Sequence, residues 1–232
     1  MSPHYRRIAA DLTERIATGR LVPGEMLPSE TELGLAYGVS QGTARRAISE
    51  LEMRGVLERR QGRGTFVTRA TAERSLFHFF RLRDAAGRAV IPELVEQTLT
   101  ARQADTAEAN ALGCETVIEI ARLRRIAGRV AARERVVLPS PRFDRLLAPG
   151  AADPPNALYP FYQGVFGITV TDADEELCPE ICPSDGHDGL DAARGEPLLR
   201  IDRRATDLSG DQIELRRCLY AMAGLRYVVS LR

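Results

Sequence analysis

The chain has 232 residues with 32 basic and 32 acidic side chains, and every basic residue is arginine because the sequence contains no lysine. With 44% hydrophobic and 28% charged residues, the composition is that of a folded globular protein and excludes disorder over most of the chain. No stretch reaches the roughly 18 apolar residues that a membrane helix needs, so we expect a cytoplasmic protein with no membrane partner. Four cysteines are too few for a disulfide scaffold and are expected to be free thiols.

The arginines are concentrated near the N-terminus. Residues 1–69 carry 11 arginines against eight acidic side chains, and several arginines stand together, as at 45–46 and 59–60. A clustered positive surface favours nucleic acid as a partner, but the same charge is also compatible with a solvated surface that binds nothing. Charge alone does not decide between these two interpretations.

Two helices are predicted for the first part of this segment. Apolar residues at helical spacing predict a helix over residues 5–16, which Gly19 is expected to end. Further along, Ser29 and Glu32 have the S-x-x-E spacing of a capping box, in which each residue satisfies a backbone N–H of the other. This spacing predicts the start of a second helix that ends near Tyr37.

A third helix and a hairpin follow. Ser40 is expected to cap the third helix, and Gly55 is expected to end it. Two short strands, 56–60 and 65–68, flank a turn with Arg63 at its tip. The apolar residues of the third helix repeat at i, i+3, i+4 and i+7 and give it one buried face. They are Ala44, Ala47, Ile48 and Leu51.

Two helices joined by a four-residue turn and followed by a basic hairpin are typical of a winged helix-turn-helix protein that reads DNA. The start of the third helix would enter the major groove, and the hairpin wing would lie along the backbone or the minor groove. The alternative is a small helical bundle whose arginines are only solvated. The predicted DNA-binding residues are Ser29, Thr31, Ser40, Gln41, Gly42, Thr43, Arg45, Arg46, Gln61, Gly62 and Arg63.

This segment resembles the winged-helix domain of GntR-type bacterial repressors. The resemblance rests on residues 21–33 (LVPGEMLPSETEL), 37–40 (YGVS) and 60–67 (RQGRGTFV), and it covers nearly all of residues 3–69. It implies a regulator that binds double-stranded operator DNA as a homodimer.

The resemblance also implies roles for individual residues. Arg45 would contact a base or a phosphate, and Gly62 would approach the minor groove from the tip of the wing. Many relatives carry arginine where this chain has Thr31 and Gln41. Because glutamine pairs with adenine where arginine prefers guanine, we expect fewer charged contacts and a different operator sequence.

The rest of the chain is predicted to be an α+β domain with an antiparallel sheet, because strands occur in runs with few helices between them. The predicted strands span residues 116–126, 130–138, 168–176, 197–207, 212–220 and 227–231. The predicted helices span residues 105–113, 141–147, 158–165 and 184–194.

This second part resembles the ligand-sensing UTRA domain of the HutC subfamily, which shares its fold with chorismate lyase. The motifs are Arg122-Leu123-Arg124, Glu134 with Leu138-Pro139, Leu158-Tyr159 and PLLRI at 197–201. The resemblance implies a small, usually anionic, metabolite as effector, with no cofactor. We therefore expect a DNA-binding domain over residues 1–69, a linker over 70–76, and an effector-binding and dimerisation domain over 77–232.

A candidate effector pocket lies on the predicted strand 116–126. Because side chains alternate along a strand, Arg122 and Arg124 share one face with isoleucines 118, 120 and 126. If 127–129 forms a three-residue loop, Glu134 stands opposite Arg122 and leaves Arg124 free to hold a carboxylate or phosphate. The alternative is a surface ion pair.

The resemblance adds two tyrosines to this site. Tyr159 and Tyr220 match pocket positions of relatives, although a tyrosine at such positions is also compatible with plain packing. Ala157 stands where relatives that bind sugar phosphates often have serine, and this difference argues against a phosphate group as the anion. The predicted effector-binding residues are Arg122, Arg124, Glu134, Tyr159 and Tyr220.

Catalytic and metal sites have little support in the sequence. The three histidines, at positions 4, 78 and 187, lack a two-histidine metal spacing, and no serine elbow, phosphate loop or dinucleotide motif occurs. We therefore predict no metal site and no catalytic residue. Two alternatives are kept, a chorismate-lyase-like enzyme and a redox sensor acting through Cys178 and Cys182.

Overall fold

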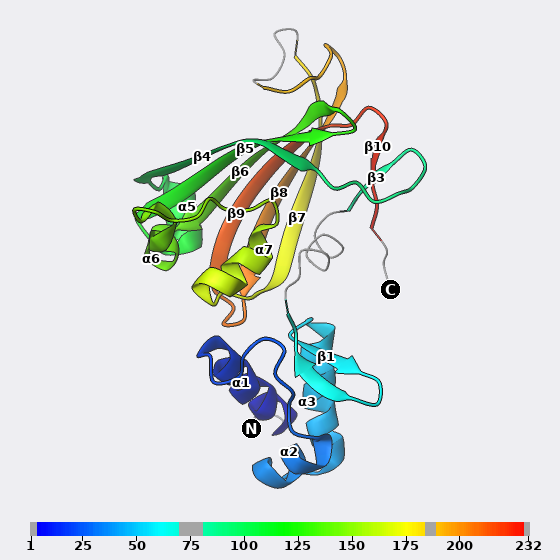
Figure 1. Cartoon of the computed structure of the whole chain (residues 1–232), viewed down its shortest axis with the longest axis vertical. Coiled ribbons are helices and arrows are strands. Elements are labelled where there is room, and N and C mark those ends of the chain that lie inside the picture. The colour runs from blue at the N-terminus through cyan, green and yellow to red at the C-terminus, as the bar shows by residue number, and fades with distance from the viewer. Residues whose placement is uncertain (1–3, 70–80, 184–188, 230–232) are drawn as a thin grey trace. The chain divides into compact units, whose positions relative to one another are not determined.

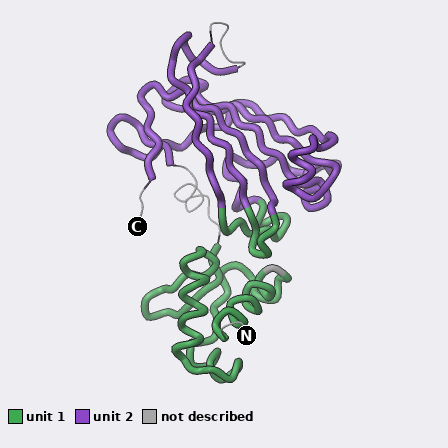
Figure 2. Tube along the Cα trace, turned by 180° about the vertical axis from the view of Figure 1, so that it is seen from behind, with its two compact units in different colours: residues 1–71, 162–172, 206–211 green, residues 72–161, 173–205, 212–232 purple. Residues whose placement is uncertain are grey.

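The computed structural model describes residues 4–69, 81–183 and 189–229. The chain divides into two compact units (Figure 2). One contains residues 1–71, 162–172 and 206–211, and the other contains residues 72–161, 173–205 and 212–232. The predicted linker over 70–76 lies outside the described residues.

The N-terminal segment forms three helices and a hairpin, as predicted (Figure 1). Ser29 and Glu32 make the capping box: the Ser29 N–H donates to the Glu32 carboxylate at 2.8 Å, and the Glu32 N–H donates to the Ser29 hydroxyl at 3.2 Å. Gly38, at φ 65°, ends the second helix in the left-handed conformation that favours glycine. The bounds are α1 His4–Ala17, α2 Glu30–Tyr37, α3 Gln41–Met53, β1 Leu57–Arg60 and β2 Gly64–Val67.

The predicted apolar face of α3 is buried against α1 and α2. Each of its four apolar residues is fully inaccessible to solvent, and leucines and isoleucines of the other two helices complete the core. Because this face is committed to packing, the opposite face of α3 is left at the surface. The core includes Ile8, Leu12, Leu33, Ala44, Ala47, Ile48 and Leu51.

The second part is built on a six-stranded sheet with the strand order β4-β5-β6-β9-β8-β7 (Figure 1), and its pairs β4–β5, β5–β6 and β6–β9 are antiparallel. Short strands β3 and β10 form a separate antiparallel pair. The bounds are β3 Leu82–Asp84, β4 Glu93–Gln103, β5 Thr116–Ile126, β6 Arg129–Pro139, β7 Val170–Ile181, β8 Pro197–Asp207, β9 Gln212–Ala221 and β10 Leu225–Tyr227.

Three of the four predicted helices are present. Helix α5, Thr106–Leu112, starts with a second capping box, Asp105 with Glu108, and packs on β6 and β9. Helix α6, Ser140–Phe143, continues as a 3₁₀ turn over Asp144–Leu147, and α7, Leu158–Phe161, continues as a π-helical turn over Tyr162–Phe166.

Other predictions were wrong in part. The predicted helix over 184–194 is not helical at 189–194, and its first five residues lie outside the described part. Strand β7 extends to Ile181, five residues beyond the prediction, whereas β10 ends at Tyr227, where a strand was predicted to begin. Strand β4 was missed because it is a sheet edge whose side chains are mostly exposed, so it has little apolar alternation.

The hairpin between β5 and β6 differs from its prediction in loop length but keeps the predicted pairing. Ile126 pairs with Arg129, so the loop is the two residues 127–128 rather than three. A register shift follows, in which Arg124 pairs with Ala132 and the neighbouring residue pairs with Val130. This β-bulge supplies the residue that the shorter loop lacks, and Glu134 therefore stands opposite Arg122 as predicted.

Candidate DNA-reading surface and effector site

The start of α3 presents its polar residues to solvent. Gln41, Gly42, Arg45 and Arg46 are exposed, whereas Ala44 between them is buried. The predicted DNA-binding face therefore exists as a surface. Helix α3 is long enough, at 13 residues, for its first turn to project the amide N–H groups that favour an anion.

A carboxylate lies in the middle of this surface. Glu30 Oε2 is 2.9 Å from Arg45 Nε and accepts from Gln41 Nε2 at 3.4 Å, and Glu30 Oε1 is 3.1 Å from Arg59 Nη2. Arg59 and Glu30 were not among the predicted site residues. The arginine pair at 59–60 was visible in the sequence, but only the folded hairpin shows that Arg59 reaches Glu30 of α2 and also lies 3.5 Å from Glu52 of α3.

The other predicted residues have different surroundings. Arg46 stacks over the ring of Tyr5 at 4.1 Å, which fixes it against α1. Ser40 and Thr43 are bound to each other at 3.0 Å in the first turn of α3, so their hydroxyls serve the helix cap. Arg63 is exposed at the wing tip, and within the described part of the chain its guanidinium makes no hydrogen bond or ion pair.

A groove of about 910 Å³ runs between the start of α2 and the wing. It gathers five of the predicted residues with Glu30 and Arg59, whereas Arg45, Arg46 and Arg63 do not line it. The predicted residues in the groove are Ser29, Thr31, Gln41, Gln61 and Gly62.

The predicted arginines of the sheet are buried. Arg122 is 2% exposed and Arg124 is 1% exposed, and both face Glu134 on β6, which is 2% exposed. Glu134 Oε2 lies 3.3 Å from Arg124 Nη1 and 3.6 Å from Arg122 Nη1, and Glu134 Oε1 lies 3.0 Å from Arg216 Nη1. Arg122 and Glu134 therefore belong to a buried cluster of charged side chains and do not form a surface ion pair.

Burial and charge act in opposite directions on Glu134. Burial opposes ionisation of its carboxyl, but the charges of Arg216, Arg124 and Arg122 outweigh burial and hold the pKa of Glu134 at about 2. The carboxylate is consequently charged at neutral pH, and it neutralises one of the three guanidinium groups that surround it.

Arg124 is not free, contrary to the prediction. It donates to the side-chain oxygen of Asn156 as well as to Glu134. Arg122 donates to the carbonyls of Pro155 at 2.9 Å and Pro154 at 3.3 Å, and to the Gln97 side chain at 2.7 Å. The two arginines thus hold the loop 154–156 on the sheet by its oxygen atoms.

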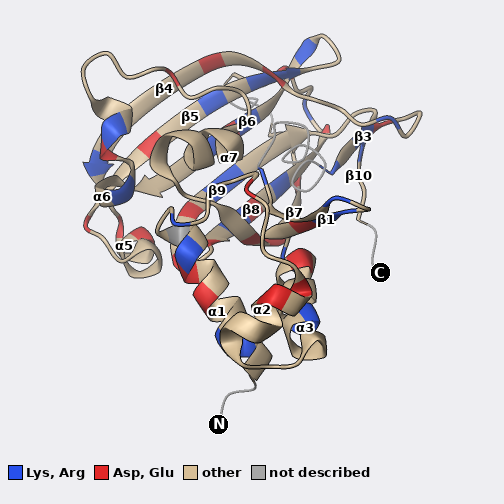
Figure 3. Cartoon of the chain, turned by 60° about the horizontal axis from the view of Figure 1, so that its bottom comes forward, with Lys and Arg blue, Asp and Glu red and all other residues tan. Residues whose placement is uncertain are grey.

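Two further buried arginines belong to the same cluster and were missed. Arg203 on β8 donates to Glu175 at 2.7 Å, and Arg216 on β9 holds Glu214 at 2.9 and 2.7 Å. Tyr159 lies between them, since its hydroxyl is 3.0 Å from Glu214 and 3.5 Å from Arg203. Alternation along the predicted strand 197–207 places Arg203 on the same face as Ile201 and Ala205, whereas on strand 212–220 the apolar residues alternate with Arg216, so the pattern gives no signal for Arg216. Basic segments recur along these strands, where Figure 3 draws them in blue.

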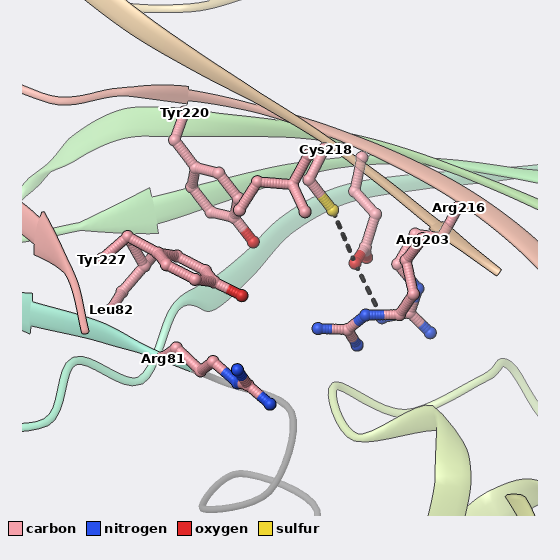
Figure 4. A pocket seen from close by; sticks show the side chains of 9 residues that line it. Arg81, Leu82, Arg203, Arg216, Cys218, Tyr220 and Tyr227 are labelled. Atoms are coloured by element: carbon pink, nitrogen blue, oxygen red, sulfur yellow. Dashed lines mark hydrogen bonds and ion pairs between the residues drawn. The ribbon is translucent and has the colours of Figure 1, made fainter. Parts of the chain in front are cut away.

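A small cavity opens beside this cluster (Figure 4). Its volume is about 20 Å³, which is room for a water molecule and not for a metabolite without rearrangement. Of the predicted effector residues, Glu134 and Tyr220 line it, whereas the two β5 arginines and Tyr159 do not. The described residues that line it are Arg81, Leu82, Glu134, Ile201, Arg203, Arg216, Cys218, Tyr220 and Tyr227.

The cysteines give no support to a redox sensor. Burial, together with the charge of Glu134, raises the pKa of Cys218 to about 12, so this thiol stays protonated at neutral pH. Cys178 lies in β7 and Cys182 follows its end, and four residues of extended chain span about 13 Å, which exceeds the reach of a disulfide.

Among the described residues no group of three histidine, cysteine or acidic side chains is placed to hold a metal. No described helix is long and apolar enough to cross a membrane.

The fold and the two surfaces together define a DNA-binding regulator with a winged helix-turn-helix segment and a separate ligand-sensing domain. Residues 4–67 match the family described as "Bacterial regulatory proteins, gntR family", and residues 96–223, more than half of the chain, match the UTRA domain. The chain therefore belongs to the GntR-type transcriptional regulators that carry a UTRA domain. The predicted fold class is confirmed.

Relatives with known names cover nearly the whole chain. The HTH-type transcriptional regulator SmoD of Agrobacterium fabrum is 29% identical over 231 residues, which is 99% of this chain and 97% of SmoD. The HTH-type transcriptional repressor NagR of Bacillus subtilis is 28% identical over 94% of this chain and 90% of NagR. Because these relatives are regulators, they agree with the expectation that the chain is not an enzyme.

Solved structures agree on the fold. The ligand-binding domain of a GntR-family regulator from Bordetella bronchiseptica is 25% identical, with a TM-score of 0.54 over 66% of this chain and 98% of that domain. PhnF from Mycobacterium smegmatis is 23% identical, with a TM-score of 0.53 over 97% of this chain and 98% of PhnF.

Proposed function

We propose that this chain is a repressor that binds operator DNA as a homodimer and is released when a small anionic metabolite binds its UTRA domain. The repressor sense is supported by relatives such as NagR, which is named a transcriptional repressor. Operator binding is supported by the exposed start of α3, where Gln41 and Arg45 stand one turn apart and project from the same face.

The charge of the arginine cluster supports an anionic effector, and this is the observation that carries the proposal. Five arginines, at positions 81, 122, 124, 203 and 216, meet three glutamates, at 134, 175 and 214, among the described residues of the cluster. Four of these arginines are buried, and a guanidinium group donates more strongly to an ionised acceptor than to a neutral one, so this region favours a ligand that carries negative charge. A carboxylate, a phosphate or a sulfate monoester has the required chemistry.

The loop 154–156 supplies a route from binding to release. Its carbonyl and amide oxygens occupy the donors of Arg122 and Arg124, and an anion is a stronger acceptor than a neutral oxygen. An anion that displaces these oxygens would free the loop. A ligand can change DNA binding only if it favours one arrangement of the protein over another, and release of this loop provides two such arrangements.

The edges of the sheet support dimerisation through β4. The opposite edge strand, β7, carries Pro179 and several carboxylates, which are features that discourage pairing with another strand. Strand β4 is 11 residues long, has no proline, and is exposed along most of its length. An antiparallel pairing of two β4 strands centred on Leu99 would bring no like charges opposite each other, since Glu96 of each copy would face Arg102 of the other, which already donates to Glu108 and Glu119 of its own chain.

The test uses a short DNA duplex selected by the wild-type chain from a random-sequence library. Its affinity is measured by fluorescence anisotropy with and without a panel of sugar phosphates and small carboxylates. We expect one of these anions to weaken wild-type binding at least tenfold. Arg124→Ala should bind the duplex as tightly as the wild type but fail to respond, and Arg125→Ala, an exposed neighbour on the opposite face of β5, should respond normally.

A third variant keeps the test decisive if Arg124→Ala does not fold. Asn156→Ala removes the competing oxygen and leaves the arginine in place, so release should need less effector. A wild-type chain without sequence preference would contradict operator binding. A normal response by Arg124→Ala together with an unchanged response by Asn156→Ala would place the effector elsewhere.

A further inference from the structure

Glu30 contacts three side chains of the DNA-reading surface, and no sequence motif indicates these contacts. One carboxylate meets Arg45 of α3 at 2.9 Å, Arg59 of the wing at 3.1 Å and the amide of Gln41 at 3.4 Å. These three partners come from two separate elements, and the carboxylate sits at the first residue of α2. We define this set of four residues as the Glu30 clasp.

The carboxylate lies below the cations. The side chain of Glu30 is 18% exposed, whereas those of Arg45 and Arg59 are 60% and 45% exposed. A phosphate or base that approaches this surface therefore meets the guanidinium groups first, and Glu30 contacts these groups from the protein side.

The contacts leave the reading edges available. Arg45 is held through Nε, and its two terminal nitrogens, which match O6 and N7 of guanine, meet no acceptor among the described residues. A carboxylate only accepts hydrogen bonds, so the Gln41 amide must direct its nitrogen to Glu30. One N–H and the carbonyl oxygen of Gln41 then remain for adenine.

We propose that Glu30 is a positioning residue that sets the sequence selectivity of the repressor, an inference that rests on the operator binding proposed above. It holds Arg45 and Gln41 in one orientation in the free protein. Ordering these two side chains therefore costs less conformational entropy when DNA binds. It also adds one negative charge beneath two cations, which lowers the attraction to any phosphate backbone irrespective of sequence. Both effects raise the ratio of specific to non-specific affinity.

The experiment compares three full-length variants on two probes, the duplex selected by the wild type and an unrelated duplex of equal length, at several salt concentrations. Glu30→Gln removes the charge but keeps the shape. Glu30→Asp keeps the charge but is too short to reach both arginines. Glu58→Gln is the matched control, because it removes a carboxylate that accepts from Arg60 at 3.0 Å on the wing, outside the clasp.

We expect Glu30→Gln to bind the unrelated duplex more tightly. We also expect the ratio of its affinities for the selected and unrelated duplexes to fall about fivefold or more, which is the discrimination that one bidentate base contact contributes. Glu30→Asp should lose affinity for the selected duplex by about the same factor and leave the unrelated duplex unchanged. Glu58→Gln should shift both duplexes equally. Thermal unfolding of each variant confirms that it is folded.

Two outcomes separate this inference from the proposed function. If the wild type shows no preference between the duplexes, operator binding and the role of Glu30 both fail. If the wild type is selective and both Glu30 variants keep its selectivity, operator binding stands and the positioning role of Glu30 is overturned. The same holds if Glu30→Gln changes selectivity no more than the Glu58 control does.

Discussion

Replacing Glu134 by glutamine should destabilise the chain strongly at neutral pH. The carboxylate of Glu134 is the shared partner of Arg122, Arg124 and Arg216, and it is almost completely buried. Glutamine has nearly the same shape, so packing changes little, but it leaves three guanidinium groups around a neutral amide. Removing one partner of a buried ion pair typically costs about 3 to 5 kcal/mol.

The pKa of Glu134 gives an independent magnitude. A carboxyl whose pKa falls from 4.5 to about 2 on folding stabilises the folded state by about 3 kcal/mol at pH 7. Because the folded-state pKa is the lower one, this stabilisation is complete above pH 4.5 and is lost as the pH falls towards 2. The deficit of Glu134→Gln should therefore be about 3 kcal/mol at pH 7 and should shrink between pH 4.5 and pH 2, where the wild type also becomes neutral at this position.

The assay is urea unfolding of the full chain at pH 7, 4.5 and 3, followed by circular dichroism. Glu93→Gln, an exposed carboxylate on β4 of the same sheet, serves as the control and should stay within about 0.5 kcal/mol of the wild type. If Glu134→Gln were as stable as this control at pH 7, the charge of Glu134 would not stabilise the folded chain. A deficit of the same size at pH 7 and pH 3 would likewise show that the loss does not come from the charge.

Arg45→Ala should weaken binding to the selected duplex by about 1 to 3 kcal/mol and relax its base preference, because a base contact is lost. Arg63→Ala should weaken binding to all sequences alike and flatten the dependence of affinity on salt, because a phosphate contact is lost; identical behaviour of the two variants in anisotropy titrations would contradict these assignments. Ala127→Gly should stabilise the chain by about 1 kcal/mol, since Ala127 has φ 50° in the two-residue loop and the left-handed conformation is costly for any residue with a Cβ atom. Urea unfolding at pH 7 measures the gain, and a loss of stability would show that the loop conformation is different.

Features that depend on neighbours in the sequence were predictable. The capping boxes at Ser29 and Asp105 and the helix ends at Gly38 and Gly113 are set by backbone hydrogen bonds over a few residues, so short motifs specify them. The buried face of α3 and the inward face of β5 follow from apolar periodicity. These local rules were sufficient to predict a winged helix-turn-helix and an antiparallel α+β domain.

Features that depend on strand order, and the way in which a register is reached, were not predictable. Glu134 does stand opposite Arg122 as predicted, but through a two-residue loop and a β-bulge instead of a three-residue loop, and no local signal marks that bulge. Strand β9 lies next to β6, and this order brings Arg216 to Glu134 across 82 residues of sequence. The pairing of Arg122 and Arg124 with the loop 154–156 likewise joins segments more than 30 residues apart.

The sequence by itself determined most of the helices and strands, the buried faces of α3 and β5, and the residues of α3 that stay at the surface, because each of these depends on spacing along one element. Only the tertiary structure decided the partners of the charged groups. A guanidinium or carboxylate is chemically able to pair with any opposite charge within reach, and reach is set by the packing of separate elements. For that reason the Glu30 clasp and the five-arginine cluster became visible only in the folded chain.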